Sequence, residues 1–173
     1  ARIASVVKLH PCLHGFRAGQ GTGTAIIEAK LEMQHSQEGH VPLYQVFLDL
    51  KKAYDTLDRE CTILVLKANG MGPNTIRLLS NVWEKDRVAL RQAGFFGPTV
   101  ERGAGVPQGD VVSPTLFNLV VDAIVRAWEK RIHELGFRAP LKCTFYADDG
   151  RLSGQCAADV QTGLDIFTDL FLR

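Results

Sequence analysis

The sequence predicts an α+β fold in which antiparallel strands pack on helices. Two apolar runs rich in β-forming residues, at 44–49 and 141–147, each deliver aspartate at their ends. Residues 150–154 follow the second run closely enough to return as its hairpin partner. Stretches with helical spacing lie between and after these runs. The sheet is therefore expected to contain both acid-bearing segments.

Length and composition are those of one domain. A chain of 173 residues buries roughly 70% of its unfolded surface, so a hydrophobic core is expected. Apolar residues make up 46% and charged residues 23%, as in soluble globular proteins. The formal net charge is +1, which excludes a global basic field, so nucleic-acid binding would need a local patch.

Other classes of protein are disfavoured by the sequence. No window approaches the ~20 apolar residues that span a bilayer, and the start lacks a signal-peptide pattern, so no membrane association is expected. The cysteines have no paired spacing, which argues against a disulfide framework and a zinc site: Cys12, Cys61, Cys143 and Cys156. Free thiols indicate an intracellular, reducing compartment.

The first half of the chain predicts one strand and three helices. Residues 15–23 form a glycine-dense loop that either approaches a ligand closely or serves as an ordinary turn and helix cap. A helix is expected at 24–38, closed by glycine, and a buried strand at 44–49. Two short helices at 58–69 and 74–84 are separated by a break containing glycine and proline.

The second half predicts a hairpin, a long helix and the acidic turn. Glycines and a proline at 88–103 favour a hairpin or irregular β segment. A turn-rich loop at 105–110 precedes a helix that ends at Leu135, with Ser113 as N-cap and Pro114 at its first position.

The chain is expected to close with a β-hairpin and a helix. Residues 141–147 and 150–154 form the hairpin, with Asp148 and Asp149 at its turn. The apolar spacing at 160–171 predicts an amphipathic helix.

Three acids at the ends of strands suggest a metal site. Asp49, Asp148 and Asp149 repel one another unless a cation offsets their charge. Mg²⁺ prefers carboxylate oxygens, and two ions ~3.5–4 Å apart promote in-line phosphoryl displacement. The alternative is a solvated turn, because Asp149-Gly150 is a favoured turn dipeptide.

Four segments in order resemble the fingers and palm motifs of reverse transcriptases, most closely those of group II introns and non-LTR retroelements. They are Gly15-Phe16-Arg17 with Gly19 and Thr22, Phe47 to Asp55, Gly105 to Asn118, and Tyr146-Ala147-Asp148-Asp149. The resemblance covers roughly residues 14–156. It implies a single fragment with part of the fingers at about 1–43 and mainly palm at 44–173. The palm-type antiparallel sheet would pack on helices, without a thumb.

The resemblance also implies a ligand set for two Mg²⁺ ions, with Mn²⁺ as a substitute. Asp49 and Asp148 would be the principal ligands, Asp149 would be a supporting acid, and the carbonyl of Leu50 would add a ligand. The three aspartates are the expected catalytic residues, and Leu50 is expected only as a metal ligand.

Other motif positions imply contacts to the incoming dNTP. Arg17 would pair with the triphosphate, and its alternative is a surface salt bridge. Tyr54 would form an aromatic floor beneath the sugar that clashes with a ribose 2′-OH, and its alternative is core packing. Two departures, Ala18 and Gln20 in place of the family's proline and basic residue, imply a weaker grip on the triphosphate.

The remaining motif positions imply contacts near the template. Gln108 would contact the template or the nascent pair, with Gly109 beside it, and its alternative is a polar loop residue without a ligand. Lys51 would either neutralise nucleic-acid phosphates or balance charge, and charge balance is favoured for Lys52 and Arg151.

The implied function is RNA-directed DNA polymerase of a retroelement. The enzyme would add dNMP to a primer 3′-OH, with an RNA template, a DNA or RNA primer and dNTPs as partners. The alternatives are an RNA-dependent RNA polymerase palm and a non-catalytic nucleic-acid-binding or scaffold module. Without a thumb, the fragment is expected to fold without polymerising.

Overall fold

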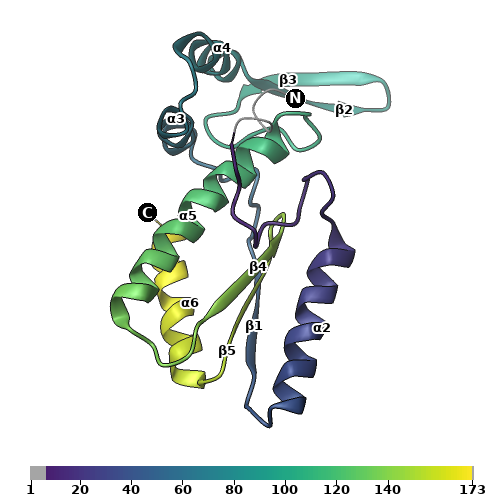
Figure 1. Ribbon diagram of the computed structural model, residues 1–173. Coiled ribbons are helices and arrows are strands. Elements are labelled where there is room, and N and C mark those ends of the chain that lie inside the picture. Colours follow the sequence, from purple (N-terminus) through teal and green to yellow (C-terminus); the bar gives the residue numbers. More distant parts are fainter. Residues whose placement is uncertain (1–6, 173) are drawn as a thin grey trace.

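The computed structural model describes residues 7–172, which form five helices and five strands (Figure 1). In chain order they are α2 (Thr22–Glu38), β1 (Tyr44–Asp49), α3 (Arg59–Ala68), α4 (Pro73–Glu84), β2 (Arg87–Gln92), β3 (Phe95–Glu101), α5 (Ser113–Leu135), β4 (Lys142–Tyr146), β5 (Asp149–Gly154) and α6 (Ala157–Phe171). None of these helices is long and apolar enough to cross a membrane.

The main sheet is antiparallel and has the order β1-β5-β4. Strand β1 pairs with β5 from Tyr44 opposite Gly154 to Asp49 opposite Asp149. Strand β4 pairs with the other side of β5, where Tyr146 also lies opposite Asp149. Helices α5 and α6 cover one face of the sheet and α2 lies along the other (Figure 1). The expected α+β sheet packed on helices is confirmed.

The core lies between the sheet and the α5–α6 pair. Trp128 of α5 stacks on Phe167 of α6 with ring centroids 4.6 Å apart, and Phe145 of β4 meets Phe167 edge-on at 5.7 Å. The indole Nε1 of Trp128 donates to the carbonyl of Gly163 at 2.8 Å, so the buried ring has no unsatisfied donor. These aromatic contacts join α5 and α6 to β4, the strand that leads to Asp148 and Asp149.

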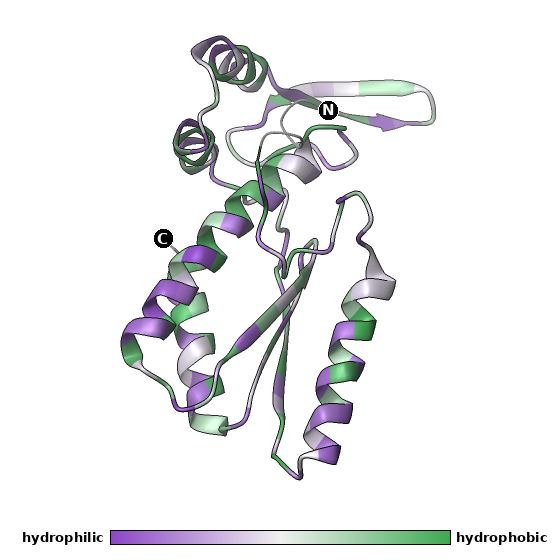
Figure 2. Cartoon of the chain, in the orientation of Figure 1, coloured by the Kyte–Doolittle hydropathy of each residue, from purple (hydrophilic) through white to green (hydrophobic). Residues whose placement is uncertain are grey.

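Helix α2 is held to the sheet by polar contacts. None of its residues is buried, and Ile26, Ile27, Leu31 and Met33 are exposed. Figure 2 shows hydrophobic and hydrophilic positions alternating along this helix. Glu32 accepts a hydrogen bond from Nη1 of Arg151 at 2.7 Å and from the hydroxyl of Ser153 at 2.9 Å. Arg151 also donates to Thr144 at 3.2 Å. Arg151 therefore balances the charge of Glu32, as expected. Because it is buried, it is not accessible to a nucleic-acid phosphate.

Strand β1 corrects one expectation. It was expected to be buried, yet Tyr44 is exposed and Phe47 is 74% exposed. The reason is its position, because among the described strands β1 lies at the sheet edge and pairs only with β5. Its apolar composition was typical of a central strand, and composition does not specify sheet order.

Helix α5 begins differently from the prediction. The N-cap position is Val112, and Ser113 is the first helical residue, with its buried hydroxyl unpaired in the described part of the chain. The predicted Ser113 cap is therefore wrong. Pro114 does lie in the first turn, and Gly136 closes the helix at φ +64°, a conformation that favours glycine.

The acidic hairpin turns one residue earlier than expected. Ala147 and Asp148 form the two-residue turn, with Ala147 at φ +54°, while Asp149 and Gly150 already belong to β5. A Cβ on Gly150 would lie 2.5 Å from the ring of Phe145. Gly150 is therefore required for close packing, and the Asp149-Gly150 turn considered from the sequence is wrong.

Candidate active site

The three acids meet at one end of the sheet. Asp49 ends β1 directly opposite Asp149, the first residue of β5. Directly opposed residues of antiparallel strands share a face, with Cβ atoms about 4.5–5.5 Å apart. The backbone N–H of Leu50 donates to the carbonyl of Asp148 at 3.3 Å, which ties the turn to the end of β1. Two segments far apart in the chain thus bring three aspartates to the same end of the sheet.

These carboxylates are available to a ligand. Asp49 and Asp149 are exposed and Asp148 is half-buried. Within residues 7–172, none of the three carboxylates has a hydrogen-bond or ion-pair partner. No group of three or more His, Cys, Asp or Glu side chains in that range is already arranged to hold a metal ion. The donor chemistry suits a hard divalent cation, which would have to draw the side chains together.

Tyr54 lies beside the acids and against helix α5. Its ring packs on Phe117 with centroids 4.9 Å apart and planes at 31°. Burial raises the pKa of the Tyr54 hydroxyl, and the negative charge of Asp148 raises it further. The hydroxyl therefore stays neutral at neutral pH. Tyr54 is half-buried, so part of the residue remains accessible to a ligand.

The loop before α5 is fastened to the turn that follows Asp49. Gly105 donates to the carbonyl of Leu57 at 3.0 Å, and Val106 donates to the carbonyl of Tyr54 at 2.8 Å. Gly105 has φ +74°, and a Cβ there would lie 2.3 Å from the carbonyl oxygen of Asp55. Only glycine permits this close approach. Gln108 follows on the same loop.

Gln108, Gly109 and Lys51 are exposed. The side chains of Gln108 and Lys51 have no hydrogen-bond or ion-pair partner in the part of the chain that the structure describes. Gly109 has φ +91°, with open space where a Cβ would be. These three positions are therefore free to meet a ligand, and their predicted roles stay predictions.

The segment before Arg17 runs beside β4. Leu13 forms a parallel bridge with Phe145, and the N–H of His14 donates to the carbonyl of Phe145 at 2.8 Å. Gly15 packs against the acidic turn, since a Cβ there would lie 2.6 Å from the nitrogen of Ala147. The glycine-dense loop therefore begins with a close approach of two backbones.

Arg17 is anchored to backbone carbonyls. Its Nη1 donates to His10 at 2.8 Å and to Leu13 at 2.7 Å. Within residues 7–172, Arg17 makes no salt bridge, so the alternative of a surface ion pair is wrong there. The remaining N–H groups of the guanidinium have no partner in the same range.

Two polar residues that support this end of the sheet had no role predicted from the sequence. Asn118 is buried in α5, and its amide donates to the carbonyl of Gly15 at 2.8 Å. His14 is buried and contacts Thr24 at 2.8 Å and Glu28 at 2.9 Å, both on α2. In the sequence, Asn118 stands out as a polar residue within the apolar run that begins at Leu116, which could have indicated a buried hydrogen-bonding role. His14 gave no comparable signal.

Comparison with known families identifies the architecture. Residues 1–171 match the family described as reverse transcriptase (RNA-dependent DNA polymerase). The chain belongs to the reverse transcriptase family. This match confirms the resemblance drawn from the four motifs and favours a reverse transcriptase domain over an RNA-dependent RNA polymerase palm. Enzymes of this family generally use divalent metal ions.

Relatives of this reverse transcriptase domain include mobile-element proteins. The chain is 28% identical over 164 residues to the retrovirus-related Pol polyprotein from the type-2 retrotransposable element R2DM of Drosophila melanogaster, covering 95% of this chain and 16% of the relative. It is 30% identical over 118 residues to the putative COX1/OXI3 intron 2 protein of Saccharomyces cerevisiae, covering 68% of this chain and 12% of the relative. The chain thus spans a small part of their lengths.

Solved structures show the same fold. Apo telomerase from Candida tropicalis, truncated from its C-terminal domain, superposes with a TM-score of 0.65 at 15% identity, covering 90% of this chain and 32% of that chain. Telomerase from Candida albicans in complex with a fragment of telomeric RNA gives a TM-score of 0.64 at 11% identity, covering 96% and 29%. The palm-type fold is therefore confirmed.

Proposed function

We propose that this domain performs RNA-templated DNA synthesis as part of a retroelement reverse transcriptase. A primer 3′-OH attacks the α-phosphate of a dNTP, and pyrophosphate leaves. The observation that carries the proposal is the register of the sheet, which sets Asp49 opposite Asp149 and beside Asp148. Membership of the reverse transcriptase family supports it.

The acids are the proposed ligands of two Mg²⁺ ions, with Mn²⁺ as a substitute. Asp49 and Asp148 are the principal ligands, and Asp149 supports them. The Leu50 carbonyl accepts from the N–H of Ala53 at 3.2 Å and keeps a second lone pair for a metal. When bound, two such ions activate the attacking oxygen and stabilise the leaving oxygen.

Tyr54 and Arg17 are the proposed dNTP contacts. The Tyr54 ring, braced by Phe117, forms the floor beneath the sugar and excludes a 2′-OH. Arg17 uses Nη1 on backbone carbonyls, which leaves Nε and Nη2 for the triphosphate. A guanidinium anchored in this way is pre-organised for phosphate binding.

Gln108 and Gly109 form the proposed contact with the template and the nascent base pair, and Lys51 neutralises a nucleic-acid phosphate. The proposed partners are an RNA template and a DNA or RNA primer. The structurally similar Candida albicans telomerase was solved with telomeric RNA, which is consistent with this proposal.

The test is primer extension on an RNA template with dNTPs or rNTPs. Wild type is compared with Asp148→Asn and with Asp165→Asn, whose exposed carboxylate on α6 contacts only Gln161 within the described residues. Each protein is assayed as the 173-residue chain and in the longest natural polypeptide that contains it. Binding of Mn²⁺ is measured in parallel by calorimetry in the presence of primer-template.

We expect Asp148→Asn to lower the rate by about a thousandfold or more and to weaken Mn²⁺ binding, because a principal anionic ligand is lost. Asp165→Asn should behave as wild type. Synthesis that persists in Asp148→Asn would contradict the ligand assignment. Preferential use of rNTPs would favour an RNA polymerase, and absence of metal binding and synthesis in wild type would favour a scaffold module.

A further inference from the structure

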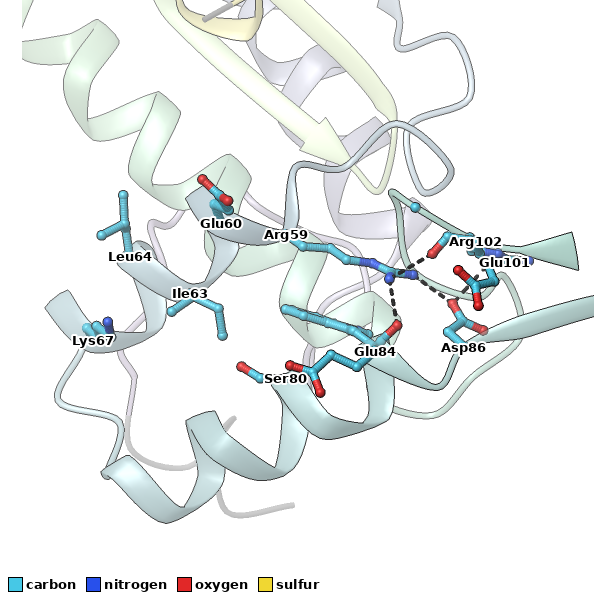
Figure 3. A pocket seen from close by; sticks show the side chains of 12 residues that line it. Arg59, Glu60, Ile63, Leu64, Lys67, Ser80, Glu84, Asp86, Glu101 and Arg102 are labelled. Carbon is cyan, nitrogen blue, oxygen red and sulfur yellow. Dashed lines mark hydrogen bonds and ion pairs between the residues drawn. The ribbon is translucent and has the colours of Figure 1, made fainter.

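Arg59 joins four chain segments at the junction of α3, α4 and the β2–β3 hairpin. Its Nη1 donates to the carbonyls of Trp83 at 3.0 Å and Arg102 at 2.9 Å, and its Nη2 pairs with Asp86 at 2.7 Å. Its Nε donates to the carbonyl of Gly105 at 2.8 Å. Figure 3 shows the side chain reaching from α3 to the base of the hairpin beside Asp86 and Arg102.

The surroundings make these bonds strong. The Arg59 side chain is 14% exposed and Asp86 is 15% exposed, so water screens the pair weakly. The guanidinium also lies over the ring of Trp83, 5.6 Å from its centroid. Charge-assisted hydrogen bonds are about twice as strong as neutral ones. Lysine could not reproduce the network, because an ammonium lacks the planar fork of donors.

The bond to Gly105 connects this network to the candidate active site. Arg59 holds the carbonyl of Gly105, while the carbonyl of Leu57 holds its N–H on the other side. The next residue, Val106, is bonded to the carbonyl of Tyr54. The loop is thus held from two directions immediately before Gln108.

We propose that Arg59 is a positioning residue that sets the loop carrying Gln108 against the Tyr54 nucleotide site. This proposal rests on the proposed polymerase function. Arg59 itself does not contact the substrate. Without Arg59, the loop is held only by the carbonyls of Leu57 and Tyr54. Gln108 would then no longer have a fixed position relative to the bound nucleotide. The expected effect falls on nucleotide binding more than on the chemical step at the acids.

The experiment compares Arg59→Met and Arg59→Lys with Arg87→Met. Arg87 is the matched control because it pairs with Glu101 on the same hairpin, at 2.7 Å and with both side chains exposed. Two readouts are used. The first is hydrogen exchange of the hydrogen-bonded amides of Gly105 and Val106 in the 173-residue chain. The second is steady-state kinetics for dNTP on a primed RNA template, with the longest natural polypeptide that contains the chain. Thermal unfolding checks that each variant is folded.

In both Arg59 variants the amides of Gly105 and Val106 should exchange about tenfold faster, and the KM for dNTP should be about fivefold higher, with kcat within about twofold of wild type. Arg87→Met should match wild type in both. If Arg59→Met does not fold, the exchange and kinetic results of Arg59→Lys test the proposal.

Two results would overturn the proposal: unchanged exchange in a folded Arg59 variant, or kcat falling while KM is constant. If the longest natural wild-type polypeptide made no DNA, that would instead count against the proposed function, and the exchange data would still report whether Arg59 holds the loop.

Discussion

Tyr54 is fixed by both its side chain and its backbone. The ring rests on Phe117, and the carbonyl accepts from Val106. The contact with Phe117 shows that Tyr54 does contribute to core packing, which was the alternative role considered for it. The residue nevertheless remains half-buried, so part of it is still accessible to a ligand.

Replacing Tyr54 by valine should relax sugar selection. Without the aromatic floor, a ribose 2′-OH meets no steric barrier, so we expect the preference for dNTP over rNTP to fall by about tenfold or more. The measurement is the ratio of kcat/KM values for the two nucleotides. Tyr54→Phe is the control, because it keeps the ring and should keep the preference. An unchanged preference in Tyr54→Val would remove Tyr54 from the sugar site.

Gly105 should be sensitive to the smallest substitution. In Gly105→Ala the new Cβ would collide with the backbone of Asp55 at a positive φ, so we expect a loss of about 3 kcal/mol in the free energy of unfolding. Urea denaturation measures this loss. Gly109→Ala is the matched control, since Gly109 also has a positive φ but open space around it, and should cost about 1 kcal/mol. Equal losses in the two variants would show that the contact with Asp55 is unimportant.

At the scale of elements, Glu32 is the main polar contact between α2 and the sheet, where it pairs with Arg151 and with Lys142. The helix buries no side chain completely, and its carboxylate Glu32 meets Arg151 and Ser153 of β5. Strand β5 also carries Asp149, so the same strand supports the acids and fastens α2. A weakened contact should therefore loosen α2 before it disturbs the core between the sheet and α5.

Removing Glu32 should destabilise the fold clearly. Glu32→Ala leaves Arg151 as a buried, unpaired cation, and we expect a loss of about 3 kcal/mol in the free energy of unfolding. Glu101→Ala provides the comparison, because its pair with Arg87 is exposed and should contribute less than about 1 kcal/mol. Chemical denaturation at constant ionic strength compares them. If Glu32→Ala were as mild as Glu101→Ala, α2 would not depend on this pair.

At the scale of the whole molecule, the reactivity of the cysteines measures how tightly the core is packed. Cys12 and Cys143 are buried with their sulfurs 3.6 Å apart, whereas Cys61 and Cys156 are exposed. The hydrogen bond between the buried thiols, together with burial, raises the pKa of Cys12 well above its usual range. A thiol kept protonated in this way is a poor nucleophile.

We expect a thiol reagent at neutral pH to label two cysteines quickly in the native protein and the other two only on unfolding. Peptide mapping should place the fast sites at Cys61 and Cys156. Complete labelling in denaturant is the control for reagent excess. Fast labelling of Cys12 would show that the segment beside β4 opens readily, contrary to its hydrogen bonds with Phe145.

The sequence by itself determined the family, the order of the elements and which aspartates lie at the ends of the strands. These features depend on local signals, such as the period of apolar residues, glycine and proline at the ends of helices, and aspartate after a strand. For the same reason the limits of α3 and α4 and the existence of the β2–β3 hairpin were predictable from short windows.

Only the tertiary structure decided how these local elements meet. The turn falls at Ala147-Asp148, a register that sets Gly150 opposite Phe145 with no room for a Cβ, and β1 is exposed because it lies at the sheet edge. The contacts of Arg59 with Gly105 and of Arg151 with Glu32 join residues 46 and 119 positions apart. Such contacts depend on strand register and on the packing of distant segments, which short-range patterns do not encode.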